Sequence, residues 1–332
     1  MSSFFKRGIE ERLSRNKEKY QLLKLKELID WSAVGELLNK QRQNSRKDAR
    51  GNASYDALKM FKAVLLGQWH SLSDEALEHA LSVRIDFMVF CDFDEQEQPD
   101  HSTLCRFRQW LSNKGLMPIL LGQINDQLAS RRLKVSKAQT AVVDASIIES
   151  RGMPQTKAIE VDEASGDVSD APPSKDVDAR WIKKAGRFYL GYKLHASCDE
   201  AGFINELDIT PANRHETKHL EPLIEHLPPQ TRVLADKGYA SRANRDLLKK
   251  HRLRTGIMHK AAPNQQISHW QKIANALIKR KRYVIEQRFG VLKRRFNFYK
   301  SSYFGTKAVL AQAFLKVMCL NLLKACNLVR YV

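Results

Sequence analysis

Residues 139–149 read Gln-Thr-Ala-Val-Val-Asp-Ala-Ser-Ile-Ile-Glu, and this stretch decides the fold of the second part of the chain. Its run of Val, Ile and Ala is typical of a strand buried on both faces of a sheet. Asp144 stands in the middle of the run, where a carboxylate costs free energy to desolvate unless a partner compensates it. We therefore predict a central strand with a functional aspartate. The alternative is that Asp144 caps a turn or pairs with an arginine.

Downstream of this strand, short apolar runs alternate with helical patterns. Strands are predicted at 187–198, 203–210, 232–236 and 254–258, and helices at 216–226, 242–250, 269–295 and 305–328. This order indicates a ribonuclease-H-like mixed β-sheet flanked by helices. Between the first two strands, residues 154–179 carry seven acidic residues and a Pro-Pro pair. We expect an exposed, acidic and flexible insertion there, at 151–185.

Upstream, the first 135 residues predict an all-helical domain. Helices begin near Ser54, at the N-cap Ser73, after Pro99-Asp100 and near Pro118. Residues 1–50 are highly charged and weakly patterned, which favours a mobile arm or a loose helix. Arg106 and Arg108 are expected to point outward. The domain is either a helix-turn-helix DNA reader or a purely structural module.

The fold class is therefore α+β, with three parts. Residues 1–135 form the helical domain, for which we predict DNA binding. Residues 136–300 form the sheet domain, and residues 301–332 form a C-terminal packing helix. Its apolar stretch, 308–329, is interrupted by Gln312, Lys316, Asn321 and Lys324, so we expect an amphipathic helix and no membrane span.

The charge balance points to a polyanionic partner. The chain has 56 Lys and Arg against 37 Asp and Glu, a net charge of +19. Nucleic acid is the first candidate and a membrane surface is the alternative. The five cysteines are scattered and form no C-x-x-C pair, which argues against a disulfide framework and a structural zinc site. The N-terminus has no apolar segment typical of a signal peptide.

Two further acids stand at informative positions. Asp236 ends the predicted strand 232–236, and carboxylates at the C-terminal ends of strands point into the crevice where ligands bind. Glu286 lies on the basic helix 269–295. At 100° per residue it falls within about 40° of Arg282 and Lys293, beside the apolar face of the helix. A solvated salt-bridge ladder is the alternative for Glu286.

Three converging carboxylates require a cation. Two of them about 4 Å apart repel by roughly 4 kcal/mol at an effective dielectric near 20. A divalent metal removes this repulsion, and oxygen ligands select Mg²⁺ or Mn²⁺ over zinc. The sequence contains no His-rich or Cys-rich cluster that would compete for a metal.

Several segments resemble bacterial insertion-sequence transposases of the DDE class, and are most similar to insertion-sequence family 5. The motifs are Val-Asp-Ala-Ser at 143–146, Asp-Lys-Gly-Tyr at 236–239, and the block Arg282, Glu286 and Lys293, in which Lys279 replaces the family's Tyr. Similar segments are Gly-Tyr-Lys-Leu-His at 191–195, Thr-Pro-Ala-Asn-Arg-His-Glu at 210–216 and Ser-Thr-Leu-Cys-Arg-Phe-Arg at 102–108. The resemblance covers roughly residues 55–325.

The resemblance implies a DNA transposase in which Asp144, Asp236 and Glu286 are catalytic and bind two Mg²⁺ (or Mn²⁺) ions. Such an enzyme cleaves a phosphodiester with water and then joins the freed 3′-OH to target DNA by transesterification. The partners would be double-stranded DNA, both terminal inverted repeats and target, with a homodimer in the DNA complex and no membrane. We expect a cytoplasmic, nucleoid-associated bacterial protein.

Basic residues near the acids are the predicted DNA contacts. They are Arg282, Lys293, Lys279, Arg288, Lys193 and His195. For His195, a hydrogen-bonded structural role is the alternative. Two rival functions remain: a transposase-derived DNA-binding regulator without catalysis, and a hydrolytic nuclease on the same fold.

Overall fold

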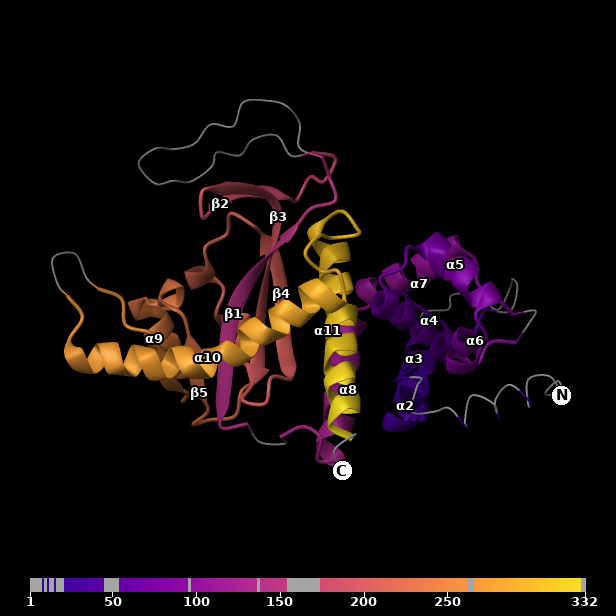
Figure 1. Cartoon of the computed structure of the whole chain (residues 1–332), viewed down its shortest axis with the longest axis horizontal. Helices are drawn as coiled ribbons and strands as arrows, with labels where there is room; N and C mark the ends of the chain where they lie inside the picture. Colours follow the sequence, from indigo (N-terminus) through magenta and orange to yellow (C-terminus); the bar gives the residue numbers. More distant parts are fainter. Residues whose placement is uncertain are drawn as a thin grey trace. The chain divides into compact units, whose positions relative to one another are not determined.

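A computed structural model describes residues 8, 11, 15, 21–44, 54–94, 97–135, 138–153, 174–261 and 266–329 (Figure 1). The chain divides into two compact units. The helical unit comprises residues 1–133 together with 321–332, and the sheet unit comprises residues 134–320. Most of the predicted acidic insertion, 154–173, and residues 45–50 of the basic run lie outside the described residues.

The helical unit is built from short helices with polar caps. They are α2 (Gln21–Leu28), α3 (Trp31–Gln43), α4 (Ala57–His70), α5 (Asp74–Val83), α6 (Ile85–Cys91), α7 (His101–Asn113) and α8 (Leu116–Ser130). Ser73 caps α5 by accepting the Ala76 N–H, and Asp100 caps α7 by accepting the Thr103 N–H. These caps satisfy N–H groups that have no partner within the helix, so the predicted starts of both helices are confirmed.

Two expectations for this unit are wrong. Residues 21–43 are not a loose arm, because α3 buries Trp31, Val34 and Leu38 at helical spacing. Nor does Arg108 point outward: it is buried, and its two Nη atoms lie 2.6 and 2.8 Å from the carboxylate oxygens of Asp74. Arg108 therefore joins α7 to α5 and is not a surface DNA contact.

The sheet unit contains the predicted mixed sheet. Its strands are β1 (Thr140–Glu149), β2 (Arg180–Lys184), β3 (Arg187–Asp199), β4 (Ile204–Pro211), β5 (Arg232–Ala235) and β6 (Arg254–Ile257). The order is β2-β3-β1-β5-β6. The strand β2 pairs with residues 187–191 of β3, and β4 pairs with residues 192–198 of the same strand. The β1, β5 and β6 strands run parallel, whereas β3 is antiparallel to β1. Gly191 of β3 passes so close to β1 that an added Cβ would lie 2.2 Å from the Ile148 carbonyl oxygen.

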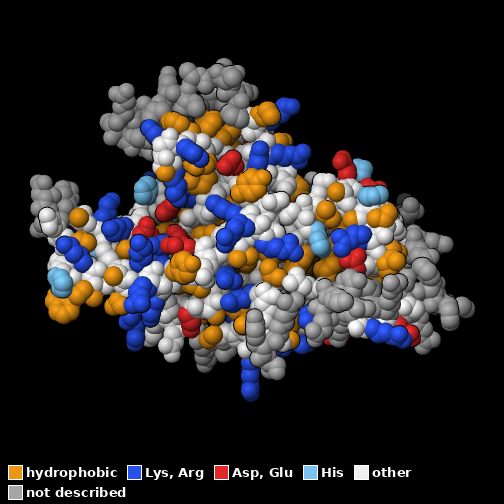
Figure 2. Space-filling model, in the orientation of Figure 1, with side chains coloured by type: hydrophobic (Ala, Val, Ile, Leu, Met, Phe, Trp, Pro, Cys, Tyr) orange, Lys and Arg blue, Asp and Glu red, His pale blue; other side chains and the backbone are white. Residues whose placement is uncertain are grey.

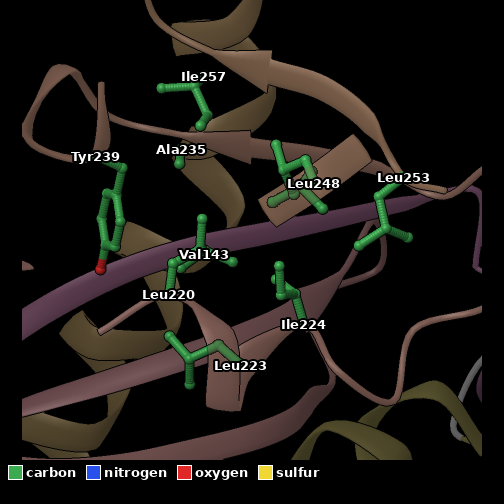
Figure 3. Packing of buried hydrophobic residues seen from close by; sticks show 10 residues of the cluster. Val143, Leu220, Leu223, Ile224, Ala235, Tyr239, Leu248, Leu253 and Ile257 are labelled. Carbon is green, nitrogen blue, oxygen red and sulfur yellow. The ribbon is translucent and has the colours of Figure 1, made fainter. Parts of the chain in front are cut away.

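The two faces of this sheet differ in what they carry. The long helix α10 (His269–Arg295) contacts β1 and β5 and crosses in front of them in Figure 1. On the other face, a hydrophobic cluster joins the strands to α9 (Arg242–Lys250) and to the short 3₁₀ helix η3 (Glu221–Leu223) (Figure 3). Successive strand residues alternate between faces, so Val143 belongs to the cluster and Asp144 faces α10.

Part of the predicted insertion belongs to the core. Residues 180–184 form β2, and Asp176 is fully buried. The Asp176 carboxylate accepts hydrogen bonds from Ser150 Oγ (2.5 Å), the Tyr192 hydroxyl and the Gly305 N–H (3.0 Å). The expectation of an exposed, flexible segment is therefore wrong for the buried Ser174, Asp176 and Ala179 and for strand β2, because acidic composition alone does not report these hydrogen bonds.

The predicted helix at 216–226 is also wrong. The structure has only two 3₁₀ turns there, η2 (Glu216–Lys218) and η3. Pro222 lies inside the predicted helix, where it removes a backbone donor and blocks regular α-helical bonding.

The C-terminal helix α11 (Thr306–Leu328) is confirmed, but it is not amphipathic. Gln312, Lys316 and Asn321 are all buried, and the Lys316 ammonium donates to the Phe296 carbonyl oxygen at 2.6 Å. Among the described residues, α11 is the one helix long and apolar enough to cross a membrane, and 83% of the relevant window is buried. Core helices of soluble proteins share these properties.

Candidate active site

Asp144 is held in the middle of β1 with its side chain only 17% exposed. One carboxylate oxygen accepts the N–H of Ala145 at 2.9 Å, and the other lies 2.9 Å from Nη2 of Arg282. Burial raises the pKa of Asp144 to about 6, against the opposing effects of Arg282 and the Ala145 N–H. The nearby negative charges of Glu216 and Asp236 raise it further. Asp144 is therefore a largely shielded carboxyl that has one cation and two further carboxylates nearby.

Asp236 follows the last residue of β5 and is 46% exposed. Its carboxylate lies 3.3 Å from Nη1 of Arg282, so a single guanidinium joins Asp236 to Asp144. The Arg282 side chain comes from α10 and is 7% exposed, with the Met258 sulfur 3.8 Å from Nη1. Two acids that lie 92 positions apart in the sequence thus meet because their strands are parallel neighbours.

Glu286 is exposed on α10, one helical turn after Arg282. The packing face predicted for this helix is confirmed, since Ile285, Phe289 and Leu292 are buried. Among the residues that the structure describes, no group of three or more His, Cys, Asp or Glu side chains is arranged to hold a metal ion. The structure therefore brings Asp144 and Asp236 together and does not assemble all three acids into such a group.

Glu216 is a fourth acid at this site, and the sequence analysis gave it no role. It begins η2 after β4, and its carboxylate lies 3.6 Å from the Lys193 ammonium. An added Cβ on Gly238 would lie 3.0 Å from a Glu216 carboxylate oxygen, so the Glu216 side chain lies close against the backbone that follows Asp236. The segment 210–216 was part of the family resemblance, which was the only available signal.

Tyr239 connects the site to the core. It is buried at the end of the cluster in Figure 3, and its hydroxyl has no hydrogen-bond partner among the described residues. Burial raises the Tyr239 pKa well above its ordinary value, and the negative charges of Glu216, Asp144 and Asp236 add to the shift. Tyr239 is therefore a neutral phenol beside the acids.

Three of the predicted DNA contacts are buried. Arg282 binds the two aspartates, and Lys193 donates to the Arg214 carbonyl oxygen at 2.7 Å. His195 is fully buried, with Nε2 2.9 Å from Thr210 Oγ1 and its ring 4.5 Å from that of His219. Burial lowers the pKa of His195 to about 3, so the ring is neutral. A direct DNA contact by His195 is therefore wrong for this structure, and the structural alternative describes it.

Lys193 and His195 also point away from Asp144. They pair with Ile147 and Ala145 of β1, and paired residues share a face of the sheet. As alternate residues of β3 they share one side of the sheet, and that side is the one opposite Asp144.

The other three predicted contacts all lie on α10. Lys279 is exposed, whereas Arg288 and Lys293 are half-buried. Burial lowers the pKa of both Arg288 and Lys293. Figure 2 shows Lys and Arg side chains spread over the face on which α10 lies. Lys279 is thus the most accessible of the six.

Comparisons with known proteins identify the family of the chain. Residues 136–322 match the family described as Transposase DDE domain, and residues 9–110 match Transposase domain (DUF772). The chain is 51% identical over 222 residues to the transposase for insertion sequence element IS1106 of Neisseria meningitidis serogroup B. That alignment covers 67% of this chain and 77% of the relative.

Solved structures give weaker likenesses. A piggyBac transposase synaptic complex with hairpin DNA has a TM-score of 0.43 at 11% identity, covering 92% of this chain and 74% of the other. A Mos1 transposase paired-end complex has a TM-score of 0.23 at 14% identity, covering 80% and 87%. The family matches cover both units of the chain, and the sheet unit carries the Asp-Lys-Gly-Tyr motif beside Asp144. The chain therefore belongs to the DDE transposases of bacterial insertion sequences, enzymes that cleave DNA and transfer its strands.

Proposed function

We propose that Asp144, Asp236 and Glu286 are the catalytic carboxylates of this transposase. The observation that carries the proposal is the single buried guanidinium of Arg282, which lies 2.9 Å from Asp144 and 3.3 Å from Asp236. Two acids that converge on one cation, at the end of a parallel strand, form the kind of site where phosphate chemistry takes place. Glu286 is the third acid because it follows Arg282 by one turn on the same helix.

The chemistry of these side chains fits hard divalent cations. Asp144 and Asp236 are oxygen donors whose repulsion Arg282 offsets, and divalent metals are the cofactors that DDE transposases generally use. We infer that the three acids hold Mg²⁺ or Mn²⁺, two ions in all. When bound, such ions activate the attacking oxygen and stabilise the leaving oxygen.

The chain's own residues have separate tasks in this proposal. The Ala145 N–H fixes the orientation of Asp144, and Asp236 is the more exposed of the two aspartates. Arg282 holds both acids in place through its two ion pairs. Lys279 and Lys293, on the same side of α10, bind the DNA backbone beside Glu286.

The wider reaction follows from this assignment. Double-stranded DNA at the terminal inverted repeats would be cut, and the freed 3′-OH would join target DNA in the same site. We propose that a homodimer carries out these steps and that residues 1–135 bind DNA. Membership of insertion-sequence family 5 and association with the nucleoid stay predictions.

The test is Asp144→Asn. The amide keeps the shape of the side chain but loses a charged oxygen ligand, so Mg²⁺-dependent nicking of a duplex carrying the element end should fall by at least about a hundredfold. DNA binding should be retained. Asp246→Asn, a half-exposed carboxylate on α9, is the matched control and should cleave normally. Wild-type cleavage by Asp144→Asn would place the metal site elsewhere.

The same assay separates the two rival functions. A wild-type protein that nicks DNA but never joins the 3′-OH to target DNA would be a hydrolytic nuclease. A protein that binds the element end and does not cut it would be a regulator.

A further inference from the structure

A row of three polar residues crosses the sheet far from the acids. Thr140, Arg232 and Arg254 are the first residues of β1, β5 and β6, and they pair with one another in register. Residues paired in register point to the same face. Thr140 shares its face with Asp144, because the two are separated by an even number of residues. Both arginines therefore lie on the α10 face, where the active site is.

A surface hollow follows this row. Its volume is about 730 Å³, and its lining includes Thr140, Arg232, Arg254 and Lys281 of α10. A neighbouring hollow of about 330 Å³ shares Thr140 and Lys281 and adds Arg280. We call the two together the Arg232–Arg254 groove. Lys281 immediately precedes Arg282, so one helix lines the groove and also enters the active site.

The positive charge of this groove is not compensated. Arg232, Arg254, Arg280 and Lys281 are all exposed, and within the described residues none of the four makes an ion pair. Glu200, a carboxylate in the lining, instead accepts the backbone N–H groups of Gln139 and Thr140.

The Arg254 guanidinium is also held in place, since its Nε donates to Gln230 Oε1 at 3.0 Å. Four cations that line this groove and make no ion pair within the described residues favour a polyanion in it. A partly fixed arginine side chain loses less conformational entropy on binding an anion than a freely moving one.

The distance to the acids suggests which polyanion fits. Four residues along a strand span about 13 Å, which separates Thr140 from Asp144. Duplex DNA advances about 3.4 Å per nucleotide of each strand. A duplex with its scissile phosphate at Asp144 and Asp236 would thus present backbone phosphates about four nucleotides away, at the groove.

We propose that the Arg232–Arg254 groove binds backbone phosphates of duplex DNA a few nucleotides from the cleaved bond. The proposal rests on the assignment of Asp144 and Asp236 as the active site. The contact is to phosphate and carries no base information, so it acts on all sequences alike. It fixes the register of the DNA relative to the acids.

The experiment compares salt dependence of binding in the full-length protein. Arg232→Ala/Arg254→Ala removes two phosphate contacts, so the slope of log affinity against log salt should flatten by about 1.8 on a duplex of unrelated sequence. Between 50 and 200 mM salt, wild-type binding should therefore weaken about 12-fold more than binding by the variant. Arg232→Lys/Arg254→Lys keeps both charges and should stay close to the wild-type slope.

The matched control is Arg242→Ala/Lys249→Ala on α9. It removes the same charge from the opposite face of the sheet, where both side chains lie within 4 Å of Asp246. Its slope should stay unchanged. An equal flattening of the salt slope in both double variants would overturn the proposal, because the loss of net charge would then explain the result. A wild-type slope in Arg232→Ala/Arg254→Ala, with an unchanged melting temperature, would overturn it as well.

Binding is measured without Mg²⁺, so cleavage does not enter the result. If Asp144→Asn cleaves normally, the active-site assignment fails whatever the slopes are. If Asp144→Asn loses cleavage and Arg232→Ala/Arg254→Ala keeps the wild-type slope, only the proposal that the groove binds DNA fails.

Discussion

Asp144 and Asp176 are both aspartates of the sheet unit that are largely shielded from solvent, but their surroundings differ. Asp176 accepts hydrogen bonds from Ser150, Tyr192 and the Gly305 N–H, and is fully buried. Asp144 has one N–H donor and one guanidinium, which it shares with Asp236. Asp176 fastens three segments of chain, whereas Asp144 keeps a partner that another cation could replace. Burial of an acid therefore does not identify a catalytic site, and the number of fixed donors around it separates the two cases.

The largest stability effect expected from this contrast is that of Asp176→Ala. The change leaves the Ser150 and Tyr192 hydroxyls without their acceptor, at about 1–3 kcal/mol each, while the Gly305 N–H keeps the Tyr192 hydroxyl, so the free energy of unfolding should fall by about 2 kcal/mol or more. Urea unfolding would measure the change. Asp246→Ala, at the surface of α9, should stay within about 0.5 kcal/mol of wild type. If Asp176→Ala lowered the free energy of unfolding as little as Asp246→Ala does, the hydrogen bonds of Asp176 would not stabilise the fold.

A third buried charge sharpens the comparison. Lys316 lies in α11, where burial lowers its pKa to about 8 and the nearby Cys319 thiol opposes this shift. The positive charge of Arg295 in turn lowers the pKa of Cys319. Between pH 8 and the unfolded-state value near 10.5, the folded protein loses this proton and the unfolded chain keeps it. Stability then rises with pH over this window, because the unfolded state binds more protons.

Lys316→Met should remove this dependence. From pH 8 to pH 10, wild type should gain about 1–3 kcal/mol of unfolding free energy relative to the variant. Urea titrations at several pH values would measure the difference. Parallel pH profiles of the two proteins would show that Lys316 is protonated equally in the folded and unfolded states.

The smallest effect concerns the acidic insertion. Replacing residues 154–173 with a Gly-Ser segment of equal length should change the unfolding free energy by less than about 0.5 kcal/mol, because the native segment has few apolar residues to bury. Extending the replacement to residue 179 removes Asp176 and should cost as much as Asp176→Ala. Equal effects of the two replacements would contradict the anchoring role of Asp176.

The strands were readable from sequence because their signals are local. The apolar run of β1, the motif that ends β5 and the Ser-Gln capping box of α10 each specify their element within a few residues. The strand β2 was not readable, since its sequence Arg-Trp-Ile-Lys-Lys is short and pairs only because β3 extends beyond β4.

The active site was likewise predictable from the sequence only in part. The positions of Asp144 and Asp236 followed from strand patterns and from the family resemblance. The contact of Arg282 with both acids could not be predicted, because helical periodicity places Arg282 beside Glu286 but cannot show that the Arg282 side chain is buried against two strands. Lys193 and His195 were misplaced because alternation predicts that two residues share a face but not which face it is.

The division of α11 between the two units has a consequence for biosynthesis. Residues 1–133 of the helical unit are synthesised before the sheet unit, whereas residues 321–332 of the same unit are synthesised after it. The side-chain amide of Asn321 donates to Asn125 Oδ1 at 2.9 Å, and this bond forms only after the whole sheet unit has been synthesised. At about 5–20 residues per second, the intervening 187 residues (134 to 320) take about 10–40 s. During that interval the nascent helices lack residues 321–332, so a chain cut short just before residue 321 carries an incomplete helical unit attached to a fully translated sheet unit.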